Sequence, residues 1–162
     1  MAQQSQPVSD TGTTVAATYT RGVLAMNRGE VAEAEKAFRA VLQVQPQHPH
    51  ARYQLSQLMM NRDKLAAVQR ENVMKQTIIA QIDFADASVS ECLDSLTIMV
   101  KEATQQKFQP NFIIKDPQGK LNGKNVTLKL SKIPASQTLQ YIAASTSCKV
   151  TYEEHAIIIE AN

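Results

Sequence analysis

The sequence predicts an α+β protein in which a helical region precedes a small domain of mixed helices and strands. Between residues 15 and 75, apolar residues recur at three- and four-residue steps, as they do on one face of a helix. Beyond residue 77, alternating apolar and polar residues indicate strands, and two further helix-like segments lie between them. We expect an N-terminal antiparallel helical hairpin plus a third helix, then a small β-α-β-β-α-β-β domain with two helices on one face of the sheet.

Composition indicates a boundary near residue 75. Every arginine lies in the first 75 residues, whereas the second half uses only lysine as its strong cation. The first 14 residues are rich in Gln, Ser and Thr and lack periodicity, which is typical of disorder. The sequence therefore predicts a disordered lead-in over 1–14, a helical region over 15–75 and an α+β domain over 76–162.

The helical region begins with two helices that share a short turn. The first runs from Val15 to Met26, and Gly29 ends it. The second begins near Glu30 and ends before Pro46, which cannot continue a helix. Because the turn is so short, the two helices must lie antiparallel.

The third helix is predicted to run unbroken from Pro49 to about Lys75, since no other Gly or Pro lies within it. One hairpin and one extra helix leave apolar surface uncovered, because helical repeats bury their faces against neighbours. That surface either caps the hairpin within the chain or meets another molecule. Candidate contact residues are Tyr53, Met59 and Leu65.

The second half opens with a strand over residues 78–84, in which Ile78, Ile82 and Phe84 are expected to point inward and Ile79 outward. A capping box over residues 88–91 then starts a helix. Its expected apolar stripe is Val89, Cys92, Leu93, Leu96, Met99, Val100 and Ala103.

Further strands are expected around Phe112–Ile114, over 125–131, and in a hairpin over 149–160; a second helix follows Pro134. Because each helix has one apolar stripe, both are expected on the same face of one sheet. Ile79 and Ile158 would then lie on the opposite face, covered by the third helix or by a partner. They complete the set of candidate partner residues.

Residue patterns for catalysis or cofactor binding are absent, so no catalytic residue, cofactor or metal ligand is predicted and the chain is not expected to be an enzyme. His48 and His50 flank Pro49 in a predicted loop, and His155 lies at a predicted hairpin tip. The net charge of +2 does not indicate a nucleic-acid partner, and no apolar run is long enough to span a membrane.

Two cysteines, Cys92 and Cys148, both lie at expected core positions and lack metal-site spacing. Two readings stay open: they are two small buried apolar residues, or they form a disulfide.

Five residues of the helical region fit the contacts of a helical hairpin. Gly22 and Ala34 are small where two helices touch, Gly29 supplies the turn, Phe38 fills the space between the helices and Pro46 stops the second. These five residues stand at the mutual spacings of the tetratricopeptide repeat signature, so the helical region resembles that repeat. Thr18 and Ala25 depart from it, and we expect one full repeat plus an extra helix.

Five segments within residues 78–160 carry a second resemblance by their order and spacing: 82–88, 124–130, 138–142, 150–152 and 157–159. Together they resemble the short N-terminal domain shared by secretins and TonB-dependent receptors, and the ring-building repeats of secretins. No secretin membrane barrel follows in this sequence, so we expect an accessory protein or an N-terminal fragment of a larger one.

This resemblance implies a non-enzymatic scaffold or accessory subunit of a secretin-type envelope assembly, such as a type IV pilus or type II secretion system. Its partners would be secretin, pilus or secretion components, or other copies of the chain. The implied location is the periplasm or cell envelope of a bacterium, with an export signal already removed. Two alternatives are a signalling module that binds a regulator, as in TonB-dependent receptors, and a generic adaptor.

Overall fold

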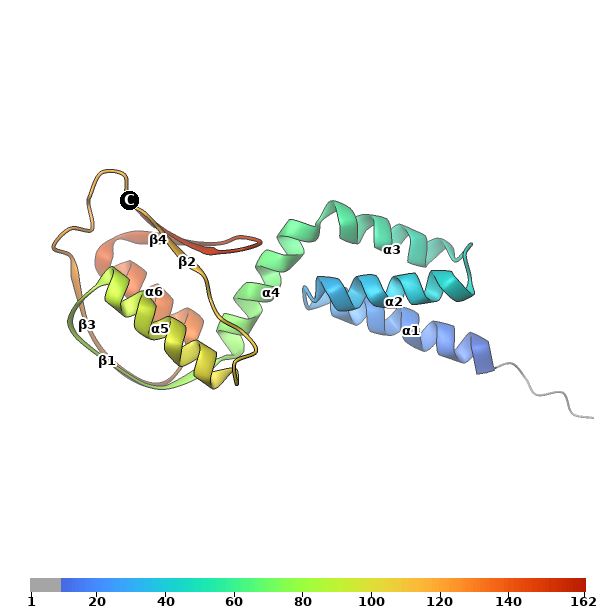
Figure 1. Ribbon diagram of the computed structural model, residues 1–162, viewed down its shortest axis with the longest axis horizontal. Helices are drawn as coiled ribbons and strands as arrows, with labels where there is room; N and C mark the ends of the chain where they lie inside the picture. Colours follow the sequence, from blue (N-terminus) through green and yellow to red (C-terminus); the bar gives the residue numbers. More distant parts are fainter. Residues whose placement is uncertain (1–9) are drawn as a thin grey trace, which may run out of the picture. The chain divides into compact units, whose positions relative to one another are not determined.

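A computed structural model describes residues 10–162, which form two compact units (Figure 1). The first unit ends at Leu65 and the second runs from Ala66 to Asn162. Most of the expected disordered lead-in lies outside the described residues, but residues 10–14 belong to the first helix. The boundary comes ten residues before the expected one because the following helix packs with the second unit.

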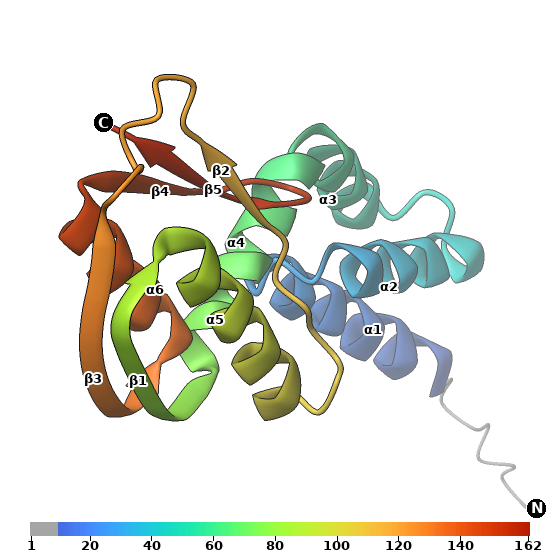
Figure 2. The ribbon, with the colours of Figure 1, turned by 60° about the vertical axis from the view of Figure 1, so that its left-hand side comes forward.

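The first unit contains three helices: α1 (Asp10–Asn27), α2 (Val31–Val44) and α3 (Pro49–Met60). α2 packs against both α1 and α3. Figures 1 and 2 show α1 and α2 side by side, with the chain reversing direction between them. Gly29 makes this reversal with φ of +74°, in the left-handed region that glycine adopts without steric cost. The expected hairpin and third helix are present.

Close approach of α1 to α2 depends on a glycine. A Cβ atom on Gly22 would lie 2.7 Å from Cε1 of Phe38 and 3.1 Å from Cβ of Ala37. Phe38 and Ala34 are fully buried, and Tyr19 contacts the Phe38 ring at a centroid distance of 5.9 Å. Gly22 and Phe38 thus meet where α1 contacts α2, Ala34 is buried on α2, and Pro46 follows the end of α2.

The prediction of one unbroken third helix is wrong. α3 ends at Met60 and α4 (Arg62–Gln76) begins two residues later, with Asn61 between them. Asn61 Nδ2 donates a 2.9 Å hydrogen bond to the Gln57 carbonyl, and the Asn61 carbonyl accepts from Leu65 N at 3.0 Å. One asparagine thus ends α3 and starts α4, because its short polar side chain satisfies a helix-end carbonyl.

The second unit follows the expected element order: β1 (Ile78–Ser88), α5 (Val89–Ala103), β2 (Phe112–Lys115), β3 (Asn125–Pro134), α6 (Ala135–Thr146), β4 (Cys148–Tyr152) and β5 (Ile157–Ala161). The α+β class is confirmed. The strands form two small sheets, however, and not the single sheet expected. β1 pairs with β3 in one, and the other has the order β2-β5-β4, with β2 parallel and β4 antiparallel to β5.

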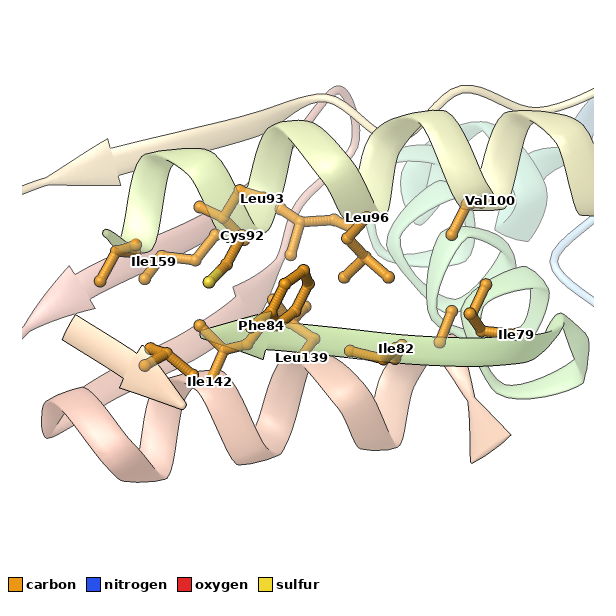
Figure 3. Close-up of a cluster of buried hydrophobic side chains, with 14 of the residues drawn as sticks. Ile79, Ile82, Phe84, Cys92, Leu93, Leu96, Val100, Leu139, Ile142 and Ile159 are labelled. Carbon is orange, nitrogen blue, oxygen red and sulfur yellow. The ribbon is translucent and has the colours of Figure 1, made fainter. Parts of the chain in front are cut away.

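Both sheets and both helices contribute to one core. α6 packs against β3 of one sheet and β4 of the other, while α5 packs against β1 and α6. Figure 3 shows the α5 side chains directed toward Phe84 of β1. The core also takes Met74 from α4 and Ile157 and Ile159 from β5. Most of the expected α5 stripe is buried, with Met99 half-buried and Ala103 exposed.

Candidate interaction surfaces

The outward face of α3 carries large apolar side chains. Tyr53 is 62% exposed and Met60 is 77% exposed. Seven residues make about two helical turns, so these two side chains share one face. Ala51 and Leu58, also seven apart, are both fully buried on the face toward the hairpin. The Tyr53 and Met60 side chains form an α3 surface that the first unit's own packing leaves in solvent.

Two other residues expected on this surface take different positions. Met59 is 46% exposed and lies beside the α3 surface. Leu65, in the first turn of α4, is half-buried. Sequence reasoning did not select Met60, although its spacing of seven from Tyr53 would have identified it.

The prediction that Ile79 and Ile158 lie on a partner surface is wrong, because both residues are buried: Ile79 is 3% exposed and Ile158 is 4% exposed. In β1 the buried positions are Ile79, Ile82 and Phe84, so the alternation changes phase between Ile79 and Ile82. Lys132, in the opposing stretch of β3, has φ of +53°, an irregularity that accompanies this shift. Ile158 lies on the central strand β5, flanked by Ile113 and Thr151.

An aromatic cluster lies where α2 connects to α3. The His48 ring stacks on Tyr19 at a centroid distance of 5.3 Å and meets the His50 ring at 6.2 Å. His48 Nδ1 also accepts a 3.1 Å hydrogen bond from Ala51 N, which caps α3. Sequence reasoning placed both histidines in a solvated loop; histidine is an unusual helix cap, so no local signal indicated the role of His48.

Arg70 connects α4 to the β4–β5 turn. Its Nε donates to the Glu153 carbonyl at 3.2 Å and its Nη2 to the Glu154 carbonyl at 2.7 Å. The guanidinium carbon also lies 5.8 Å from the centroid of the Phe108 ring. Burial lowers the pKa of Arg70 from its usual value, because desolvation disfavours the cation.

A cavity of about 320 Å³ lies beside this contact. Its lining comes from α4, from the segment after α5 and from the turn, and consists of Ala66, Gln69, Arg70, Val73, Lys107, Phe108, Gln109 and Glu154. Two Arg70 nitrogens already donate hydrogen bonds to backbone carbonyls and are therefore not free to bind a ligand in this cavity. Nearby, burial and then the charge of Glu71 raise the pKa of Tyr152 to about 12.

Within residues 10–162 there is no group of three or more His, Cys, Asp or Glu side chains arranged to hold a metal ion. Cys92 and Cys148 are both free thiols. Burial, followed by the charge of Glu91, raises the pKa of the Cys92 thiol to about 11. None of the described helices combines the length and the apolar character needed to cross a membrane.

In comparisons with known proteins, no protein-family model, no curated protein and no solved structure matches the chain.

Proposed function

We propose that this protein is a non-enzymatic interaction scaffold, an accessory subunit of a secretin-type assembly of the bacterial envelope such as a type IV pilus or type II secretion system. The observation that carries this proposal is the exposed α3 surface, Tyr53 and Met60, on a helical unit whose own core is closed by Phe38. Scattered exposed apolar residues are ordinary, but two large ones on one helix face favour a protein contact.

A second support is the element order of the second unit. Its strands and helices follow the order predicted from the hydrophobic pattern of the segment that resembles the short domain of secretins. This segment lies downstream of a helical hairpin that resembles a tetratricopeptide repeat. The helical unit would recruit one component of the assembly through the α3 surface. The second unit would pack against other ring-building domains in the periplasm.

The test is affinity capture of the tagged chain from chemically cross-linked native cells, with mass spectrometry of the recovered proteins. We expect secretin, pilus or secretion components. The double variant Tyr53→Glu, Met60→Glu should lose them, because burying a Met side chain alone contributes about 1.5–3 kcal/mol, which is roughly tenfold or more in affinity. Gln43→Glu, which adds a charge at an exposed position on α2, is the matched control.

Recovery of cytoplasmic proteins alone would contradict the envelope assignment. Unchanged recovery with the double variant would contradict the role of the α3 surface, whatever the partner. Release of the native protein with the periplasmic fraction on osmotic shock provides an independent check of the location.

A further inference from the structure

β2 is an edge strand with apolar side chains on both of its faces. Ile113 is 42% exposed and Ile114 is 38% exposed, and consecutive residues of a strand point to opposite faces. β2 pairs only with β5 in the described part of the chain, so its other edge is open. An open edge with apolar side chains is a ready template for another strand.

The backbone geometry identifies the open groups. Ile157 N donates a 2.8 Å hydrogen bond to the Asn111 carbonyl, and Phe112 is the register partner of Ile157. In a parallel ladder, a residue on one strand bonds to the two residues that flank its partner. The N–H and C=O groups of Phe112 and Ile114 therefore point away from β5, toward the open edge.

The other open edges in residues 10–162 carry features that oppose pairing. β4 exposes Lys149, and a charged side chain protects a strand edge. β1 contains a bulge between Phe84 and Ala87, with Asp86 at φ of +54°, and β3 contains Lys132 at φ of +53°. Lysine and backbone irregularity thus protect these three edges. β2 contains no bulge and no left-handed residue, and its one lysine, Lys115, follows the two isoleucines at the end of the strand.

The outward face of α5 contributes acidic charge beside this edge, which itself ends in the exposed Lys115. Glu91, Asp94, Ile98 and Glu102 recur at helical spacing and are all exposed, with Ile98 at 59%. Figures 1 and 2 show β2 and the segment before it running alongside α5. α6 packs against β4, at the opposite edge of this sheet. A strand added beyond β2 would lie on the α5 side, near an acidic stripe with one apolar side chain.

We propose that the open edge of β2 is a strand-addition site for an extended segment of another polypeptide, with alternating apolar side chains and flanking Lys or Arg residues. Backbone hydrogen bonds to Phe112 and Ile114 provide the pairing, Ile113 and Ile114 the apolar contact, and the α5 stripe the preference for basic residues. This contact is separate from the α3 surface and does not depend on the partner proposed above.

A second copy paired through β2 alone does not fit this edge. Four residues offer only two outward N–H and two outward C=O groups, whereas stable dimers bury on the order of 1,200–2,000 Å². A flexible segment can continue past β2 along α5, which a rigid copy of the same strand cannot do.

The test uses the whole chain as bait for a phage-displayed library of random twelve-residue peptides. We expect selected peptides to alternate apolar residues and to carry Lys or Arg, with binding that weakens at high salt. Ile114→Pro removes an outward N–H and leaves the ladder to β5 intact, so it should weaken binding at least tenfold. Val150→Pro is the matched control, since Val150 N–H points outward from the opposite edge of the same sheet.

Amide hydrogen exchange, measured on the protein without substitutions, tests the proposal even if a proline variant fails to fold. The amide protons of Phe112 and Ile114 should exchange more slowly when a selected peptide binds. The proposal is overturned if the library yields no binder, if Ile114→Pro and Val150→Pro bind equally well, or if peptide binding leaves both amides unprotected.

Discussion

Arg70 Nη2 donates a 2.7 Å hydrogen bond to the carbonyl oxygen of Glu154, 84 residues further along the chain. With the Nε bond to the Glu153 carbonyl, the guanidinium ties α4 to the β4–β5 turn. α4 therefore belongs to the second unit from Ala66 onward, although it follows α3 almost directly in sequence.

Replacing Arg70 by Met should destabilise the second unit by about 1–2 kcal/mol, since hydrogen bonds from charged groups contribute somewhat more than neutral ones. Urea denaturation followed by circular dichroism measures the change. Arg62→Met, which removes an exposed arginine at the start of the same helix, should change stability by less than about 0.5 kcal/mol. Equal effects from the two variants would contradict the role of the Arg70 contacts.

Gly22→Ala should destabilise the helical unit because the added Cβ would meet the buried Phe38 ring. Overpacking costs about 1–3 kcal/mol, and the better helix propensity of alanine offsets about 1 kcal/mol of it. Gly12→Ala lies in the same helix with no atom within 4 Å of the new Cβ, and it should be neutral or stabilising. Thermal denaturation measures the stability of both variants. Gly12→Ala reports the effect of helix propensity alone, and Gly22→Ala reports that effect together with the contact against Phe38.

His48→Ala should destabilise α3 by about 1 kcal/mol, the usual loss when a helix cap is removed. His48 Nδ1 accepts from Ala51 N, whereas His50 is exposed and makes no such bond to the helix start. His50→Ala therefore serves as the control. His48→Asn should restore most of the stability, because asparagine is a good cap. Failure of that rescue would show that stacking on Tyr19 matters more than the cap.

Glu91 should make the stability of the second unit fall in acid. Hydrogen bonds from the Ser88 side chain at 2.7 Å and from its backbone N–H at 2.8 Å lower the pKa of Glu91. A carboxylate whose pKa is lower in the folded state stabilises that state above its unfolded pKa, and this stabilisation is lost as the pH falls through the folded pKa. Stability measured below about pH 5 should therefore fall less steeply in Glu91→Gln than in Glu102→Gln, the exposed control on the same helix.

The Cys92 thiol should resist modification in the folded protein. It is fully buried, and its pKa is raised to about 11, so little thiolate forms at pH 8. In a Cys148→Ser variant, which leaves Cys92 as the single cysteine, an aromatic disulfide reagent should react quickly only after urea is added. Rapid reaction without denaturant would mean that the core around Cys92 opens readily.

Local patterns predicted most of the helices and strands of this chain. The spacing of Ser88 and Glu91 predicted a capping box that is present in the structure, and the α5 and α6 stripes were predicted from helical periodicity. These features depend on neighbours three or four residues away. The turn at Gly29 could be predicted as well, because it depends on the conformation of that one glycine.

The features that sequence reasoning missed depend on distant residues. Alternation identifies a strand but not its partner, so nothing in β2 or β3 indicated that they belong to different sheets. The burial of Ile79 follows an irregular stretch of two paired strands, and the Arg70 contacts join segments far apart in the chain. Asn61 was overlooked because it interrupts a helix without Gly or Pro.

The pairing of the strands also determines the order in which the chain can fold. β1 pairs with β3, and β2, which lies between them in sequence, pairs with β5 near the C-terminus. The two sheets are thus interleaved along the chain: the second sheet begins with β2, before the first sheet is completed by β3. Long-range pairing is slow because loop closure precedes any gain in contacts. We therefore expect the α1–α2 hairpin, built from consecutive helices, to fold first during synthesis. The hydrogen bonds of Arg70 on α4 can form only after Glu153 and Glu154 have left the ribosome.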